Sequence, residues 1–104
     1  MSVDFPRNPD LRIRARFYDK ENGGPKTSFG LGFVPLMLNK GDGAYYEVRA
    51  YFEKENPILA GSTRELFVIF LAEESALKFQ LGDKFYISIP RNIGEGKVLE
   101  VCYK

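Results

Sequence analysis

Hydrophobic and polar side chains alternate along several short stretches of the chain. Between residues 11 and 18, three arginines alternate with four apolar residues, Leu11, Ile13, Ala15 and Phe17. A period of two places successive side chains on opposite faces of a β-strand. The stretch therefore predicts a strand with one apolar face and one basic face.

Similar runs recur along the chain, separated by Gly, Pro and Asn, which are typical of turns. The further strands are expected at residues 33–38, 45–52, 65–71, 84–89 and 96–103. The run at 65–71 is apolar on both faces, which indicates a strand covered on both sides. Pro35 lacks a backbone donor and favours an edge or irregular pairing. Together, six short strands predict an all-β fold, a small, mainly antiparallel closed barrel.

The remaining segments have weaker patterns. Residues 1–10 contain two prolines and two aspartates and are expected to form a loose lead-in. Residues 73–79 have weak helical character, but the run is too short for a stable helix. A chain of 104 residues is the usual size of one domain, so a single barrel domain is expected at residues 11–104.

Composition narrows the classes of function. The chain has 15 Lys and Arg, 14 Asp and Glu, and no His, which is the commonest general base and metal ligand. A single cysteine, Cys102, excludes an internal disulfide and a multi-cysteine metal site. We therefore expect a protein that is not an enzyme and uses no metal or cofactor. The formal charge of +1 gives no overall attraction to nucleic acid or to an anionic membrane.

The cellular compartment is predicted from the lack of a recognisable signal peptide or membrane-spanning segment in the sequence. The N-terminal residues show no apolar stretch preceded by positive charge, so no signal peptide is expected. The longest apolar run, at residues 66–72, is shorter than a membrane span. With a free cysteine, these features favour the reducing cytoplasm and no membrane partner.

Four short segments stand in order along most of the chain. They are Gly23-Gly24-Pro25-Lys26-Thr27-Ser28-Phe29, Phe33-Val34-Pro35, Leu59-Ala60-Gly61-Ser62 and Arg91-Asn92-Ile93-Gly94-Glu95-Gly96-Lys97-Val98-Leu99-Glu100-Val101. In order and spacing they resemble the C-terminal β-barrel, the third domain, of elongation factor Tu and related translational GTPases. The resemblance implies a translation-factor C-terminal barrel that binds tRNA, or a protein that normally grips this barrel, such as a nucleotide-exchange partner.

The chain also departs from that family. Val34 stands where the family has an arginine, and the family's Gly-rich loop, which lies near the T stem of bound tRNA, is shortened to residues 88–91. No Gly-x-x-x-x-Gly-Lys-Ser/Thr phosphate loop occurs in the sequence, so we expect no hydrolysis of GTP.

The arginine stripe, Arg12, Arg14 and Arg16, is the sharpest electrostatic feature. Alternation places these side chains on one face of one strand, about 7 Å apart. They could contact phosphates or an acidic protein surface. The alternative is a solvated outer face on which Glu47 or Glu100 pairs with the arginines.

Five further residues are candidates for binding. Lys26 and Thr27 match positions at which the family contacts tRNA, and a phosphate oxygen suits both side chains; alternatively, Thr27 caps a local turn. Tyr45, Tyr51 and Tyr86 could be exposed and stack on bases or anchor a protein. Alternatively, they are simply good strand formers.

Other polar features favour structural roles. The segment Gly94-Glu95-Gly96 is typical of a β-bulge or a tight bend between closely packed strands rather than of a phosphate cradle. Cys102 is expected to be a half-buried structural thiol, because no His could activate it. Glu73, Glu74 and Asp83 would indicate an enzyme only if they lay in a deep pocket.

Two functional hypotheses follow. The first is a non-catalytic module that binds tRNA or a translation-related protein, with the arginine stripe, Lys26 and Thr27 carrying RNA binding. The second is a protein-binding mimic, an immunity or decoy protein that occupies a partner or toxin targeting the elongation factor. Exposed tyrosines and near-neutral charge suit the second.

Overall fold

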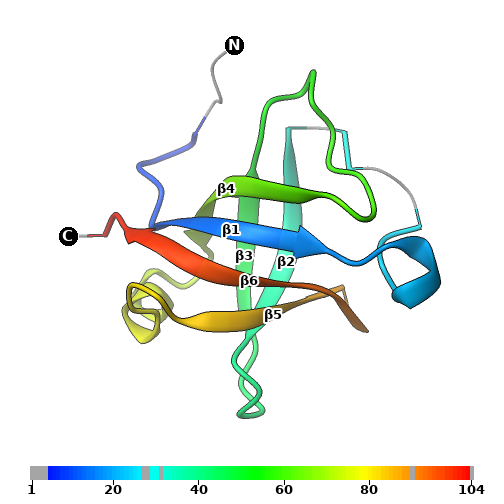
Figure 1. The fold of residues 1–104 in the computed structure, drawn as a ribbon. Coiled ribbons are helices and arrows are strands. Elements are labelled where there is room, and N and C mark those ends of the chain that lie inside the picture. The colour runs from blue at the N-terminus through cyan, green and yellow to red at the C-terminus, as the bar shows by residue number, and fades with distance from the viewer. Residues whose placement is uncertain (1–4, 27–28, 31, 90, 104) are drawn as a thin grey trace.

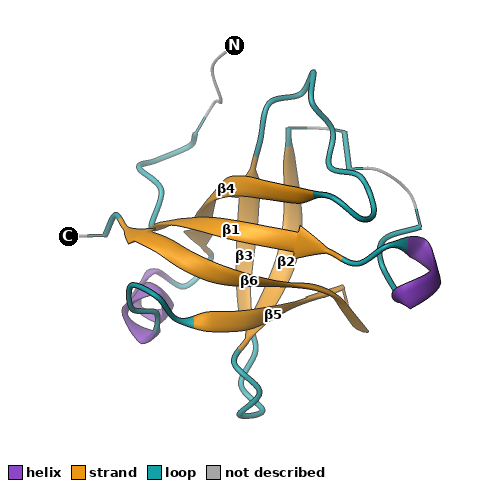
Figure 2. Ribbon diagram, viewed as in Figure 1, coloured by secondary structure: helices purple, strands orange, loops and turns teal. Residues whose placement is uncertain are grey.

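The structure is a computed structural model in which residues 5–26, 29–30, 32–89 and 91–103 are described. These residues form six strands and two short 3₁₀ turns (Figures 1 and 2). The strands are β1 (Leu11–Phe17), β2 (Phe33–Asn39), β3 (Tyr46–Tyr51), β4 (Thr63–Phe70), β5 (Lys84–Ile89) and β6 (Arg91–Val101). The 3₁₀ turns are η1 (Lys20–Asn22) and η2 (Glu73–Lys78).

The strands close into a barrel in the order β1-β4-β3-β2-β5-β6. Every neighbouring pair is antiparallel. Figure 1 shows β4, β1, β6 and β5 side by side in front, crossing over β3 and β2 behind them. The predicted all-β, six-stranded closed barrel is therefore confirmed.

Alternation along the strands fills the barrel with apolar side chains. The four apolar residues of β1, Leu11, Ile13, Ala15 and Phe17, are fully buried, as the pattern predicts. Val48 and Ala50 of β3 are buried in the same core. The arginines of β1 consequently face outward, on the surface that β1 shares with its neighbours β4 and β6.

Two strands differ from the predictions by two or more residues at an end, and the other differences are of one residue. The last strand runs over residues 91–101 rather than 96–103, because residues 91 to 97 pair with β5 and residues 94 to 101 pair with β1. The fourth strand begins at Thr63 instead of Glu65, since Thr63 and Arg64 pair with β1. The irregular pairing expected at Pro35 is confirmed: β2 pairs with β3 from Phe33 to Leu38 but with β5 only from Met37 to Asn39.

The segment before β1 is tied to the barrel through Asp10. Its carboxylate accepts two hydrogen bonds of 2.9 Å from the guanidinium of Arg7 and one of 2.8 Å from the backbone N–H of Phe70. Its backbone bonds to Val68 of β4 and to Cys102, just after β6. Asp10 therefore joins three parts of the chain that meet at one end of β1.

Candidate functional site

The outer face of β1, β6 and β5 brings part of the arginine stripe together with two lysines. Arg14 of β1 lies opposite Lys97 of β6, and Lys97 lies opposite Lys84 of β5. All three side chains are exposed. At a strand spacing of about 4.8 Å the three positions span about 10 Å. We call these three residues the cationic row.

The cationic row is not neutralised by its surroundings. Like charges directly opposite each other on neighbouring strands destabilise a sheet. Within the described residues, no carboxylate forms an ion pair with any of the three side chains. Glu65 lies opposite Arg14 on the other side, but its carboxylate bonds to Arg12. An anion that bound here would therefore relieve repulsion already present in the fold.

The cationic row lies beside a shallow pocket of about 240 Å³. Arg14, Lys84 and Lys97 line the pocket together with Arg16 and Glu95. Arginine and lysine donors at one concave position suit the oxygens of a phosphate. The shape and the donors together make this face the strongest candidate for binding an anionic ligand.

Arg12, at the other end of the stripe, is already paired. Its Nε lies 3.1 Å from Glu100, and its Nη1 bonds to Glu65. These hydrogen bonds, to Glu100 first and then to Glu65, raise the pKa of Arg12 above its usual value. The alternative in which Glu100 pairs with the stripe is confirmed. The alternative with Glu47 is wrong, because Glu47 is on β3 and β4 separates β3 from β1.

Arg16 belongs to a second paired group. Its Nη2 lies 3.1 Å from Glu95, and the hydroxyl of Tyr18 donates a hydrogen bond of 3.3 Å to the same carboxylate. The Arg16 guanidinium also lies 5.4 Å from the centre of the Tyr18 ring. Burial, and next the charge of Glu95, raise the pKa of Tyr18. Of the predicted stripe, Arg14 is thus the member whose charge the described residues do not pair.

Lys26 is not brought together with the stripe. It lines a separate pocket of about 170 Å³ with Arg91, near the hairpin that joins β5 and β6. Arg91 and Lys97 are six positions apart along β6, which corresponds to about 20 Å. Thr27, the other candidate in this segment, lies outside the described residues.

The candidate tyrosines have different environments. Tyr45 and Tyr86 are exposed, by 57% and 43%, as expected. Tyr51 is only 7% exposed, so the prediction of an exposed ring is wrong. The reason is that Phe5 of the N-terminal segment packs edge-on against the Tyr51 ring at 5.6 Å between ring centroids, and Phe33 lies 6.0 Å away.

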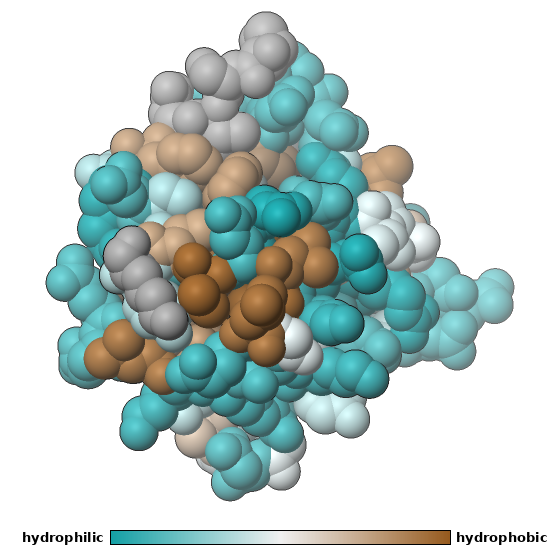
Figure 3. All heavy atoms as spheres, turned by 60° about the vertical axis from the view of Figure 1, so that its left-hand side comes forward, coloured by the Kyte–Doolittle hydropathy of each residue, from teal (hydrophilic) through white to brown (hydrophobic). Residues whose placement is uncertain are grey.

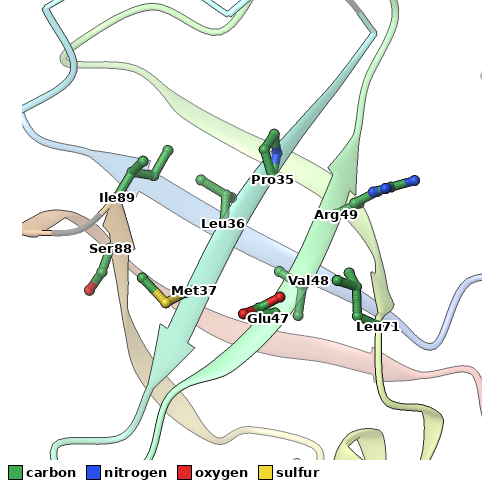
Figure 4. Close-up of a pocket in the computed structure, with 9 residues that line it drawn as sticks. All are labelled: Pro35, Leu36, Met37, Glu47, Val48, Arg49, Leu71, Ser88 and Ile89. Atoms are coloured by element: carbon green, nitrogen blue, oxygen red, sulfur yellow. The ribbon is translucent and has the colours of Figure 1, made fainter.

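An apolar groove of about 390 Å³ lies on the outside of β2 and β3 (Figure 4). Its apolar lining includes Pro35, Met37, Leu71 and Ile89. A second apolar surface is visible in Figure 3, where hydrophobic side chains gather on a largely hydrophilic face. That face is the left-hand side of Figure 1, which carries the N-terminal segment, the end of β6 and η2. The molecule therefore offers apolar surface away from the cationic row.

The acidic candidates Glu73 and Asp83 each lie beside a cationic side chain at the surface. Glu73 lines an open cavity of about 600 Å³, but its side chain is 74% exposed and lies 3.5 Å from Arg7. Asp83 accepts hydrogen bonds from Lys40 and from the backbone N–H of Gln80, which lower the pKa of its carboxyl group. Among the described residues no group of three or more acidic, Cys or His side chains could hold a metal ion.

Cys102 is expected to react slowly with thiol reagents. Burial, and next the charge of Glu100, raise the pKa of its thiol, so less thiolate is present at neutral pH. Alkylation by a maleimide at neutral pH should be roughly ten-fold slower in the folded protein than in urea. Stopped-flow measurement of the alkylation rate checks this. Equal rates in both states would show that the fold does not shield the thiol.

The comparisons with known proteins add no relative. No family model and no curated protein matches the chain. Among the described residues no helix is both long and apolar enough to cross a membrane. The surface geometry described above is therefore the structural basis for inferring a function.

Proposed function

We propose that the protein is a non-catalytic module that binds RNA of the translation apparatus, such as tRNA, through the outer face of β1, β6 and β5. The observation that carries the proposal is the cationic row. Its three side chains, Arg14, Lys97 and Lys84, come from three strands and lie opposite one another. Among the described residues, no carboxylate forms an ion pair with any of them. A phosphate backbone supplies the missing negative charge.

The surrounding charges support the same surface. Glu65, Glu95 and Glu100 are the acidic residues nearest to the row in the register of β4 and β6. All three are hydrogen-bonded to Arg12 or Arg16. Their negative charge is thus balanced locally, while the positive charge of the cationic row is not. A near-neutral protein can therefore present one locally basic face.

The resemblance to the C-terminal barrel of elongation factor Tu supports RNA of translation as the ligand. A six-stranded closed antiparallel barrel is the fold that the resemblance implies, and this chain has such a barrel. The resembling segments include the whole of β6, which contributes Lys97 to the row. We propose that the protein is a relative of that barrel and binds without hydrolysing a nucleotide.

Titration with bulk tRNA at two salt concentrations tests the proposal. Three phosphate contacts predict that affinity falls about 20- to 40-fold between about 50 and 200 mM salt. Changing Arg14, Lys84 and Lys97 to Ser together should lower the affinity at low salt by roughly ten-fold or more and flatten the salt dependence. Fluorescence anisotropy of labelled tRNA measures both effects.

The matched control removes the same charge elsewhere. Lys20, Lys54 and Lys78 are exposed and lie outside the strands of the candidate face. Their joint change to Ser should reduce tRNA affinity much less than the change in the cationic row. Equal losses in the two variants, or no binding of the unmodified protein at low salt, would contradict the proposal.

A second candidate function is the protein-binding mimic, an immunity or decoy protein that occupies a partner or toxin of the elongation factor. The apolar groove beside Pro35, Met37 and Ile89 favours it, because protein interfaces have apolar centres and polar rims. Glu47 and Arg49 supply polar groups at the same groove (Figure 4). Absence of tRNA binding at low salt would favour the protein-binding mimic over the RNA-binding module.

A further inference from the structure

The candidate face carries an aromatic ring beside the cationic row. We infer that this face takes single-stranded rather than duplex RNA, with a base stacked on Tyr86 and the adjoining phosphates on the cationic row. The inference rests on the proposed function. It adds that the RNA is single-stranded and that Tyr86 contacts one of its bases.

Tyr86 and the cationic row share one surface. Tyr86 is two residues from Lys84 on β5, so both side chains point outward, about 7 Å apart. In the register of the sheet, Tyr86 lies opposite Glu95 of β6, next to the position at which Lys84 meets Lys97. A nucleotide whose phosphate lay on the row could therefore place its base over this ring.

The Tyr86 ring has surface available for stacking. It is 43% exposed, and within the described residues its hydroxyl forms no side-chain hydrogen bond and its ring packs on no other aromatic ring. By contrast, Tyr51 is buried between Phe5 and Phe33. Exposed aromatic rings on a sheet are the platforms on which single-stranded binders stack bases.

The neighbouring carboxylate does not oppose this arrangement. Glu95 lies opposite Tyr86, but Arg16 and the Tyr18 hydroxyl hold its carboxylate at 3.1 and 3.3 Å. Arg16 lies opposite Glu95 on β1, and Tyr18 directly follows that strand. The surface around Tyr86 therefore keeps the positive charge of Lys84 without an unpaired negative charge beside it.

A duplex would not use the Tyr86 ring. Its bases are stacked on each other inside the helix, so a ring on a flat sheet meets sugars and phosphates instead. A single strand can turn one base outward onto the ring while its backbone follows the cations. The close placement of ring and row thus favours a single strand.

Binding of two RNA probes tests the inference. The probes are a single-stranded oligonucleotide of about ten nucleotides and the same sequence annealed to its complement. At low salt the single strand should bind roughly ten-fold more tightly. Tyr86→Leu should weaken binding of the single strand by roughly ten-fold and leave duplex binding unchanged, whereas Tyr86→Phe should bind like the unmodified protein.

The matched control is Tyr45→Leu, because Tyr45 is also exposed but lies just before β3, outside the candidate face. It should leave both affinities unchanged. Circular dichroism verifies that each variant is folded. Equal binding of the two probes, or equal losses in Tyr86→Leu and Tyr45→Leu, would overturn the inference while leaving the effect of the cationic row intact. If neither probe binds, or the Ser triple variant binds both as well as before, the proposed function fails as well.

Discussion

Replacing Phe79 by Ala is expected to lower the free energy of unfolding by about 3–5 kcal/mol. Phe79 directly follows η2 and is fully buried. The centre of its ring lies 5.2 Å from that of Phe70, 5.3 Å from Tyr46 and 6.0 Å from Phe85. Truncation would remove these contacts and leave a cavity that surrounding strands, held by their ladders, cannot fully close.

The position of Phe79 is held by its backbone as well. Its N–H donates to the carbonyl oxygen of Ala76, and its own carbonyl accepts a hydrogen bond of 3.1 Å from the Tyr103 hydroxyl. The ammonium group of Lys40 lies 4.7 Å from the ring centre. These contacts join η2, the β2–β3 hairpin and the C-terminal residues around one aromatic ring. Truncation to Ala would keep the two backbone hydrogen bonds and would remove the contact of the ring with Lys40 and its packing against the other aromatic rings.

Urea denaturation followed by circular dichroism measures the loss. A small domain has a total stability of about 5–15 kcal/mol, so the expected loss is a large share of it. Leu77→Ala is the matched control, because Leu77 belongs to η2 but is 60% exposed, and its change should cost less than about 0.5 kcal/mol. Similar losses in the two variants would mean that Phe79 does not form part of the core.

The barrel itself could be predicted because alternation is a local property. In β1 the apolar positions Leu11, Ile13, Ala15 and Phe17 define the inner face without reference to any other strand. The contribution of Phe79 could not be predicted in the same way. It depends on η2 turning back against the end of the barrel, and the short run at residues 73–79 carries no signal for that direction.

The candidate site shows a similar division. Alternation places Arg12, Arg14 and Arg16 on one outer face, but their partners depend on which strands flank β1. Those strands are β4 and β6, which are distant in sequence. Lys84 and Lys97 were therefore missed, although each stands at an outward position of its own strand. The register across β1, β6 and β5 is the information that the sequence lacks.

Tyr51 illustrates a further cause of error. Its place in the alternation of β3 predicts an outward side chain. The ring is nevertheless buried, because Phe5 and Phe33 pack against it. Residues 1–10 have no periodic pattern, so the path of Phe5 over β3 and β4 could not be read from the sequence. The aromatic side chain of Phe5 was the one feature of this segment that could have indicated packing against the barrel.

Replacing Gly96 by Ala is expected to lower the free energy of unfolding by about 2–3 kcal/mol. Gly96 of β6 lies opposite both Ala15 of β1 and Phe85 of β5. A Cβ atom at this position would lie 2.6 Å from Cε1 of Phe85 and 2.7 Å from the carbonyl oxygen of Arg14. The Phe85 ring is buried and the Arg14 oxygen is backbone, so neither can move without cost. The expected role of this glycine-rich segment, close packing between strands, agrees with these contacts.

The same substitution should weaken the candidate site, because Gly96 stands beside Lys97 and its added methyl group would push against β1 and β5, the strands that hold Arg14 and Lys84. Gly30→Ala is the matched control: its Cβ would meet nothing closer than Pro57, at 4.0 Å, and should change stability by less than about 0.5 kcal/mol. Urea denaturation and tRNA binding at low salt, measured on both variants, separate the two effects. If Gly96→Ala were as stable as Gly30→Ala, the close approach of β1, β6 and β5, and with it the spacing of the cationic row, would have to be revised.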